Sequence, residues 1–163
     1  MRKTALICCT ILLIFSHCFK KENDCAPRNI VAPVSEVQAV KDYLGSASVV
    51  ATEHSSGLFY QVLSEGMGMA PQICSSIRVR FSGKLVNGTE FESSSDVVLN
   101  LKLMLESWRV ALPMIKPGGR IRFYVPPTLG YGADGKKDKN TNAVLVAPYT
   151  PVIIYEVTLL EVS

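Results

Sequence analysis

The feature that most restricts the fold is an alternation of apolar and polar side chains that begins near Gly57 and recurs to the end of the chain. This pattern is typical of β-strands with one face in a core and the other in solvent. The stretches are short, and turn signals such as Asn87-Gly88 separate them. We expect strands over residues 58–63, 77–82, 97–103, 121–125 and 152–160.

One segment within this region has helical periodicity instead. Trp108, Ala111 and Leu112 share a face of the expected helix over residues 105–115, and Pro117-Gly118-Gly119 ends it. Several short strands with one interposed helix indicate an α+β domain over residues 57–163. In such a domain a twisted antiparallel sheet wraps around the short helix. The polar stretch 135–142 carries Lys136, Lys137 and Lys139, which we expect to form a solvated loop tip.

A second helix is expected before this domain, over residues 35–44. Ser35 can cap it, Gly45 ends it, and an apolar face recurs at spacings of three and four: Val34, Val37, Val40, Tyr43 and Leu44. A helix that covers the core is favoured over an outer decoration or a dimer contact. Residues 33–56 are therefore interpreted as a helical extension, and the polar residues 18–32 as a linker.

The first 17 residues are typical of an export signal. Arg2 and Lys3 precede an apolar run from Ala5 to Phe15 that is too short to span a bilayer and is followed by polar residues. Cys18 lies where the run ends, so the segment resembles a bacterial lipoprotein signal, which implies a lipid on Cys18 and a membrane anchor. Simple secretion and a buried hydrophobic helix are the alternatives. Either export route predicts a cell-envelope or periplasmic protein.

Cysteine and histidine content narrows the chemistry. Export and lipidation would leave Cys25 and Cys74, which an oxidising compartment allows to pair, although the sequence leaves that pairing open. Only His17 and His54 are present, and His17 lies at the edge of the signal. A multi-histidine metal site and a Ser-His-Asp triad are therefore disfavoured.

Charge disfavours nucleic acid as a partner. The chain has 17 basic and 14 acidic residues, and removing Arg2 and Lys3 leaves 15 against 14. Nucleic-acid binding needs a clustered basic surface, and the composition predicts none.

Five motifs occur in an order that resembles the FKBP-type peptidyl-prolyl cis-trans isomerases, from about Gly57 to Val162. They are Val79-Arg80-Phe81-Ser82-Gly83, Gly88-Thr89-Glu90-Phe91-Glu92-Ser93-Ser94, Pro117-Gly118-Gly119-Arg120, Val125-Pro126-Pro127-Thr128-Leu129-Gly130-Tyr131-Gly132 and Ile154-Tyr155-Glu156-Val157-Thr158-Leu159-Leu160. The resemblance implies the isomerisation of X–Pro peptide bonds in proline-containing unfolded polypeptides, with no cofactor or metal. It also implies binding of rapamycin-like macrolides.

The resemblance also implies the site. Trp108 would form the base of an apolar cleft, Tyr131 would present its hydroxyl, and the Leu105 N–H would bind a substrate carbonyl. The catalytic set is Phe81, Phe91, Glu92, Trp108 and Tyr131. The substrate-binding set is Leu99, Met104, Leu105, Val146, Ala147 and Tyr155, with Val146 and Ala147 on a flap above the cleft.

Several positions depart from the family pattern. Phe81 replaces a Tyr and so lacks a hydroxyl, Glu92 replaces a shorter Asp, and Leu99 replaces a frequent Phe. The loop between Tyr131 and Val146 is also longer than in the smallest members. These changes leave two alternatives open: a chaperone or peptide-binding module of the same fold with weak activity, and a structural lipoprotein without a cleft.

Overall fold

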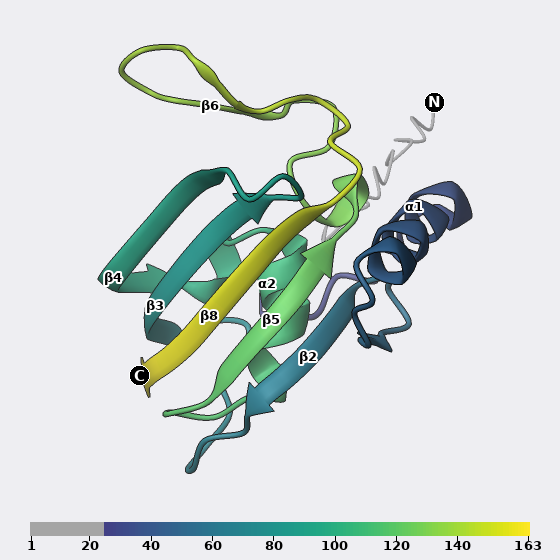
Figure 1. Cartoon of the computed structure of the whole chain (residues 1–163). Coiled ribbons are helices and arrows are strands. Elements are labelled where there is room, and N and C mark those ends of the chain that lie inside the picture. Colours follow the sequence, from purple (N-terminus) through teal and green to yellow (C-terminus); the bar gives the residue numbers. More distant parts are fainter. Residues whose placement is uncertain (1–24) are drawn as a thin grey trace, which may run out of the picture.

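The computed structural model describes residues 25–163, which form a six-stranded antiparallel sheet with one short helix against it (Figure 1). The strand order is β1-β2-β5-β8-β3-β4, so the C-terminal strand lies near the middle of the sheet. The fold class predicted from the sequence is confirmed. The sheet strands are β1 Thr52–Glu53, β2 Phe59–Ser64, β3 Ser76–Leu85, β4 Glu90–Asn100, β5 Arg120–Val125 and β8 Ile153–Val162.

Helix α2 (Glu106–Ala111) covers one face of the sheet, and its apolar face is the predicted one. Trp108, Ala111 and Leu112 are all at most 1% exposed and belong to the main core. The α-helix is shorter than the predicted 105–115, because a 3₁₀ turn, η2 (Leu112–Met114), replaces its last part. Pro113 has no N–H to donate, so the regular hydrogen-bonding pattern cannot continue through it.

Strand β4 also ends earlier than predicted. The alternation extends to Leu103, but Leu101–Leu103 form a 3₁₀ turn, η1, with Leu101 fully buried. The Asn100 side chain accepts a hydrogen bond of 3.0 Å from the backbone N–H of Lys102, which begins this turn. A capping side chain therefore ends the strand where apolar periodicity alone predicts that it continues.

Helix α1 (Val34–Ser46) packs on the other face of the sheet, over a second apolar cluster of Val40, Leu44, Phe59, Tyr124 and Val152. The predicted ends of this helix are wrong. Pro33, with its fixed φ, precedes the first turn, and no side chain caps it, so Ser35 is not the cap. Gly45 lies inside the helix, and Val34 is 85% exposed, outside the apolar face.

The segment before α1 runs as an extended chain along the domain. A disulfide joins Cys25 to Cys74, and the backbone N–H of Ala32 donates to the Ser56 carbonyl. The expected export signal and Cys18 lie outside the described residues. Within residues 25–163, no helix is long and apolar enough to cross a bilayer.

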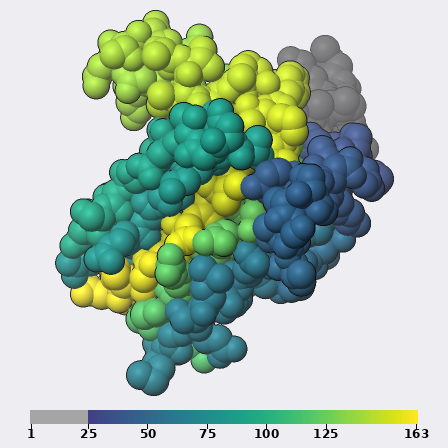
Figure 2. Space-filling view, viewed as in Figure 1, coloured from purple at the N-terminus to yellow at the C-terminus, as the bar shows by residue number. Residues whose placement is uncertain are grey.

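A small hairpin of β6 (Lys136–Lys137) and β7 (Val144–Val146) follows the 3₁₀ turn η3 (Pro127–Leu129). Figures 1 and 2 show that this β6–β7 hairpin projects beyond the ends of β3 and β4. Its base returns to the body of the domain, since Val146 is only 2% exposed. The hairpin therefore joins the sheet at one corner and leaves its tip in solvent.

Candidate active site

The predicted aromatic residues meet at one end of the sheet, above α2. Trp108 makes edge-on contacts with Phe81 (5.1 Å between ring centroids) and Tyr155 (5.4 Å). Phe91 makes edge-on contacts with Tyr155 (5.7 Å) and Tyr131 (6.1 Å). Edge-to-face geometry at these distances is favourable because the positive ring edge meets the negative ring face. Five side chains from five separate segments thus form one cluster.

Strand register explains how these rings come together. Tyr155 on β8 is opposite Phe123 on β5 and Gly83 on β3, and Gly83 is in turn opposite Glu92 on β4. A Cβ at Gly83 would lie 2.8 Å from both the Phe91 and the Tyr155 rings. The missing side chain therefore leaves room for the Phe91 and Tyr155 rings to pack beside β3.

Glu92 is the centre of a polar cluster at the edge of these rings, the Glu92 cluster, which also contains Tyr131, Lys136 and Tyr155. One carboxylate oxygen of Glu92 accepts hydrogen bonds from the Tyr131 hydroxyl (2.8 Å) and the Tyr155 hydroxyl, and the other accepts from Lys136 Nζ. Lys136 Nζ also lies 3.0 Å from the Tyr131 hydroxyl oxygen. The hydroxyls of Tyr131 and Tyr155 thus meet at one carboxylate oxygen.

Burial sets the protonation of this cluster. Burial raises the pKa of the Tyr155 hydroxyl far above its ordinary value, and it raises that of Tyr131 as well. Burial alone would lower the pKa of Lys136, but hydrogen bonds to Glu92 and Tyr131 outweigh it and raise that pKa. At neutral pH both hydroxyls therefore keep their protons and Lys136 is charged.

The expected open cleft over Trp108 is not found. The indole is 1% exposed, and its Nε1 has no hydrogen-bond partner within the described residues. The reason is steric, because Phe81 and Tyr155 pack edge-on against the ring and fill the space beside it. Trp108 is thus part of the core in this conformation.

The residues predicted to form the walls of the cleft pack against the core that contains the aromatic cluster. Leu99, Met104 and Leu105 are half-buried and pack against the main core. Leu105 immediately precedes α2, and its carbonyl accepts hydrogen bonds from the N–H groups of Trp108 and Arg109. In the described part of the chain the Leu105 N–H has no partner, so this donor remains available to a ligand carbonyl.

The two residues expected on a flap, Val146 and Ala147, differ in their exposure to solvent. Val146 is buried at the end of β7, whereas Ala147 is exposed. Together with Tyr131 they line a crevice of only about 10 Å³, the space of roughly one water molecule. Val146 therefore anchors the base of the β6–β7 hairpin, and Ala147 alone of the two faces solvent.

Lys136 is the residue that sequence reasoning missed. It was expected in a solvated tip with Lys137 and Lys139, but its side chain is 24% exposed and ion-paired to Glu92. Its ammonium also lies 5.1 Å from the centroid of the Tyr131 ring. The sequence carries no signal for this contact, because it depends on how the hairpin docks beside β4.

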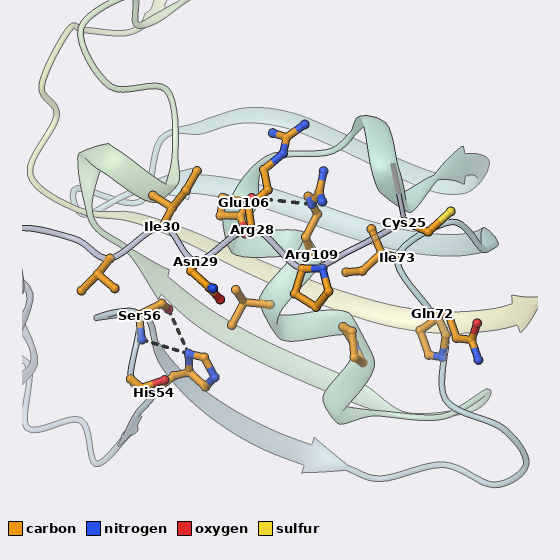
Figure 3. A pocket seen from close by; sticks show the side chains of 16 residues that line it. Cys25, Arg28, Asn29, Ile30, His54, Ser56, Gln72, Ile73, Glu106 and Arg109 are labelled. Carbon is orange, nitrogen blue, oxygen red and sulfur yellow. Dashed lines mark hydrogen bonds and ion pairs between the residues drawn. The ribbon is translucent and has the colours of Figure 1, made fainter. Parts of the chain in front are cut away.

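A separate cavity of about 540 Å³ lies on the other side of α2. Figure 3 shows Glu106 and Arg109 of α2 beside the extended segment that carries Arg28, Asn29 and Ile30. None of the predicted site residues lines this cavity. Among residues 25–163, no three His, Cys, Asp or Glu side chains gather in a way that could hold a metal ion.

Comparisons with known proteins agree with this geometry. Residues 68–160, more than half of the chain, match the family of FKBP-type peptidyl-prolyl cis-trans isomerases. The peptidyl-prolyl cis-trans isomerase Mip of Coxiella burnetii is 34% identical over 113 residues, which cover 67% of this chain and 46% of that protein. The isomerase FkpA of Escherichia coli is also 34% identical over 113 residues, covering 67% and 39%.

Solved structures show the same fold. A peptidyl-prolyl cis-trans isomerase from Pseudomonas syringae superposes with a TM-score of 0.66 at 26% identity, covering 81% of this chain and 97% of that one. The E. coli FkpA structure gives a TM-score of 0.66 at 27% identity, covering 79% and 60%. The chain belongs to the FKBP-type peptidyl-prolyl cis-trans isomerase family, and it spans less than half the length of the curated relatives it matches.

Proposed function

We propose that this protein is a peptidyl-prolyl cis-trans isomerase that assists the folding of exported proteins. The observation that carries the proposal is the contact of Phe81, Phe91, Trp108, Tyr131 and Tyr155 in one cluster within the segment that matches the family. Its substrates are proline-containing segments of unfolded or partly folded chains. X–Pro isomerisation takes tens to hundreds of seconds, slow enough to limit folding.

The chemistry needs no nucleophile. Rotation about the X–Pro bond must overcome a barrier of about 18–20 kcal/mol that arises from amide resonance. A twisted amide has lost that resonance, and an apolar aromatic surface favours it over the more polar planar amide. Catalysis is then preferential binding of the twisted form. The free Leu105 N–H and the Tyr131 hydroxyl are the donors that would hold the peptide carbonyls in place.

Access to the indole requires a local rearrangement. Trp108 is 1% exposed, so a proline ring reaches it only when the side chains packed over it move aside. Phe81, Met104 and Leu105 are half-buried and pack against the main core, and they are the side chains proposed to move aside. A rapamycin-like macrolide would enter by the same opening.

The second candidate is a chaperone or peptide-binding module of the same fold. The sealed indole favours it, because a closed base removes the surface on which the twisted amide would be stabilised. The hydrogen bond from the Tyr131 hydroxyl to Glu92 also favours the binding module, because that hydroxyl is then not donating to a peptide carbonyl. Such a protein would hold apolar peptide segments without accelerating their isomerisation.

A protease-coupled isomerisation assay separates the two candidates. We expect the protein purified from cells expressing the full chain to accelerate isomerisation of a proline tetrapeptide. We expect Tyr131→Phe, which removes one hydroxyl, to weaken that activity, whereas Tyr149→Phe at a residue 66% exposed should not. A wild-type rate equal to the uncatalysed rate, with aggregation of unfolded protein still suppressed, would favour the binding module.

Export and lipid anchoring are part of the proposal. The signal over residues 1–17, with Cys18 directly after it, would place a lipid seven residues before Cys25. The Cys25–Cys74 disulfide supports export, because disulfides persist mainly in oxidising compartments. Residues 57–163 would then be the isomerase domain, with 33–56 as its helical extension. Metabolic labelling with a fatty acid should mark the wild type and not Cys18→Ser, and an unlabelled wild type would exclude the anchor.

A further inference from the structure

Lys136 has an unusual position for a lysine on a projecting hairpin. Its neighbours Lys137 and Lys139 are exposed, but its own side chain reaches back to the sheet and is 24% exposed. Its ammonium contacts Glu92 and the Tyr131 hydroxyl oxygen at the same time. Among residues 25–163, Lys136 is the basic residue whose side chain forms an ion pair with Glu92.

Counting protons shows what this arrangement does to Tyr131. The Tyr131 hydroxyl has one proton, and in this conformation it is donated to Glu92 Oε1 at 2.8 Å. A lone pair on the same hydroxyl oxygen accepts from Lys136 at 3.0 Å. To donate to a peptide carbonyl, the hydroxyl must leave Glu92. The carboxylate that it leaves still accepts from Tyr155 and from Lys136.

We propose that Lys136 is a positioning residue that acts through Tyr131 to make the tyrosine hydroxyl available to a substrate carbonyl. Lys136 neutralises Glu92, so the carboxylate keeps a charged partner when the Tyr131 hydroxyl turns to the peptide. It also donates to the Tyr131 oxygen, which polarises the O–H bond and strengthens it as a donor. This inference rests on the proposed isomerase function and deepens it.

The expected kinetic signature is in KM. The hydrogen bond from Tyr131 orients the peptide in the planar and in the twisted state alike, so weakening it reduces uniform binding. In Lys136→Met the Glu92 carboxylate has lost the ammonium that it pairs with, so it retains the Tyr131 hydroxyl more tightly. We expect KM for a proline peptide to rise about tenfold, with kcat changed less than about twofold. The rise reflects the loss of the charge-assisted hydrogen bond from Lys136 to the Tyr131 hydroxyl. Lys136→Arg should recover most of that binding.

The experiment is a double-mutant cycle in the protease-coupled assay, with protein purified from cells expressing the full chain. Lys136→Met is compared in the wild-type and Tyr131→Phe backgrounds, with Lys137→Met as the matched control on the same strand. If Lys136 acts through Tyr131, Lys136→Met changes KM less than about twofold once the hydroxyl is absent. Lys136→Gln serves as the second variant if Lys136→Met does not fold.

A second readout does not depend on turnover. Ultraviolet titration of the tyrosines should show one residue ionising at higher pH in Lys136→Met than in Lys137→Met, because the charged donor at Tyr131 is gone. An active wild type with Lys136→Met indistinguishable from Lys137→Met would overturn this inference alone. So would a KM effect that persists in the Tyr131→Phe background. A wild-type rate equal to the uncatalysed rate would overturn the proposed function and this inference together.

Discussion

Phe81 stands edge-on to Trp108, with ring centroids 5.1 Å apart and ring planes at 84°. The pair joins strand β3 to helix α2, and such contacts contribute about 0.5–1.5 kcal/mol beyond the area they bury. Tyr155 also packs edge-on against the indole, with ring centroids 5.4 Å apart, so the Trp108 ring is enclosed by aromatic side chains. The same contacts therefore stabilise the core and restrict access to the proposed site.

Replacing Trp108 should destabilise the fold strongly. A fully enclosed indole leaves a large cavity when truncated, so Trp108→Ala is expected to lower the free energy of unfolding by about 3–5 kcal/mol. Urea denaturation followed by circular dichroism measures this. Because Trp108 is the single tryptophan, native fluorescence should also be shielded from an aqueous quencher. Ready quenching in the free protein would show that the indole is open to solvent.

Removing the disulfide should also lower stability. Cys25 and Cys74 are 49 residues apart in sequence, and closing a loop of that length restricts the unfolded chain. Replacing both by serine is expected to cost about 2–4 kcal/mol in the chain-entropy account. Urea midpoints of the oxidised wild type and the double variant give the comparison. Equal midpoints, with the bond in the wild type verified by mass spectrometry, would contradict the expectation.

Helix α1 should contribute to the stability of the domain. Leu44 is 6% exposed within the cluster that joins α1 to Phe59 and Tyr124, so Leu44→Ala should lower the free energy of unfolding by about 2–5 kcal/mol. Val34→Ala is the matched control on the same helix, because Val34 is 85% exposed and should change stability by less than about 0.5 kcal/mol. Similar effects of both changes would mean that α1 does not pack on the sheet.

Stability should fall in acid partly because of Glu156. Burial opposes ionisation of this carboxyl, but hydrogen bonds from Arg122 and Arg120 outweigh burial and hold its pKa below the ordinary 4.5. A carboxyl with a depressed folded pKa stabilises the fold above its unfolded pKa, and this contribution is lost as the pH falls through the folded value. Glu156→Gln should therefore differ from wild type most at neutral pH.

Thermal unfolding from neutral pH to about pH 3 measures this difference. The gap in melting temperature should narrow as the pH drops below about 4.5. Glu161→Gln, at an exposed carboxyl on the same strand, is the control. A gap between wild type and Glu156→Gln that stays constant down to pH 3 would contradict the assignment.

Local patterns predicted much of the sheet and of the candidate site. Alternation located β2, β3, β5 and β8, and the shared face of Trp108, Ala111 and Leu112 located α2, because side-chain direction in these elements follows from backbone period alone. Element ends were less well predicted. The Asn100 side chain ended β4 and Pro113 ended α2, and apolar periodicity takes no account of either.

The sequence by itself determined the family, the sheet with its covering helix, and the set of aromatic residues that the site contains. These depend on residue type and spacing, which are local properties of the chain. Tertiary structure alone decided that Trp108 is enclosed by Phe81 and Tyr155, that Gly83 leaves room for the Phe91 and Tyr155 rings, and that Lys136 leaves solvent to pair with Glu92. Each of these contacts joins strands or loops far apart in sequence, so its geometry exists only once strand register and hairpin docking are fixed.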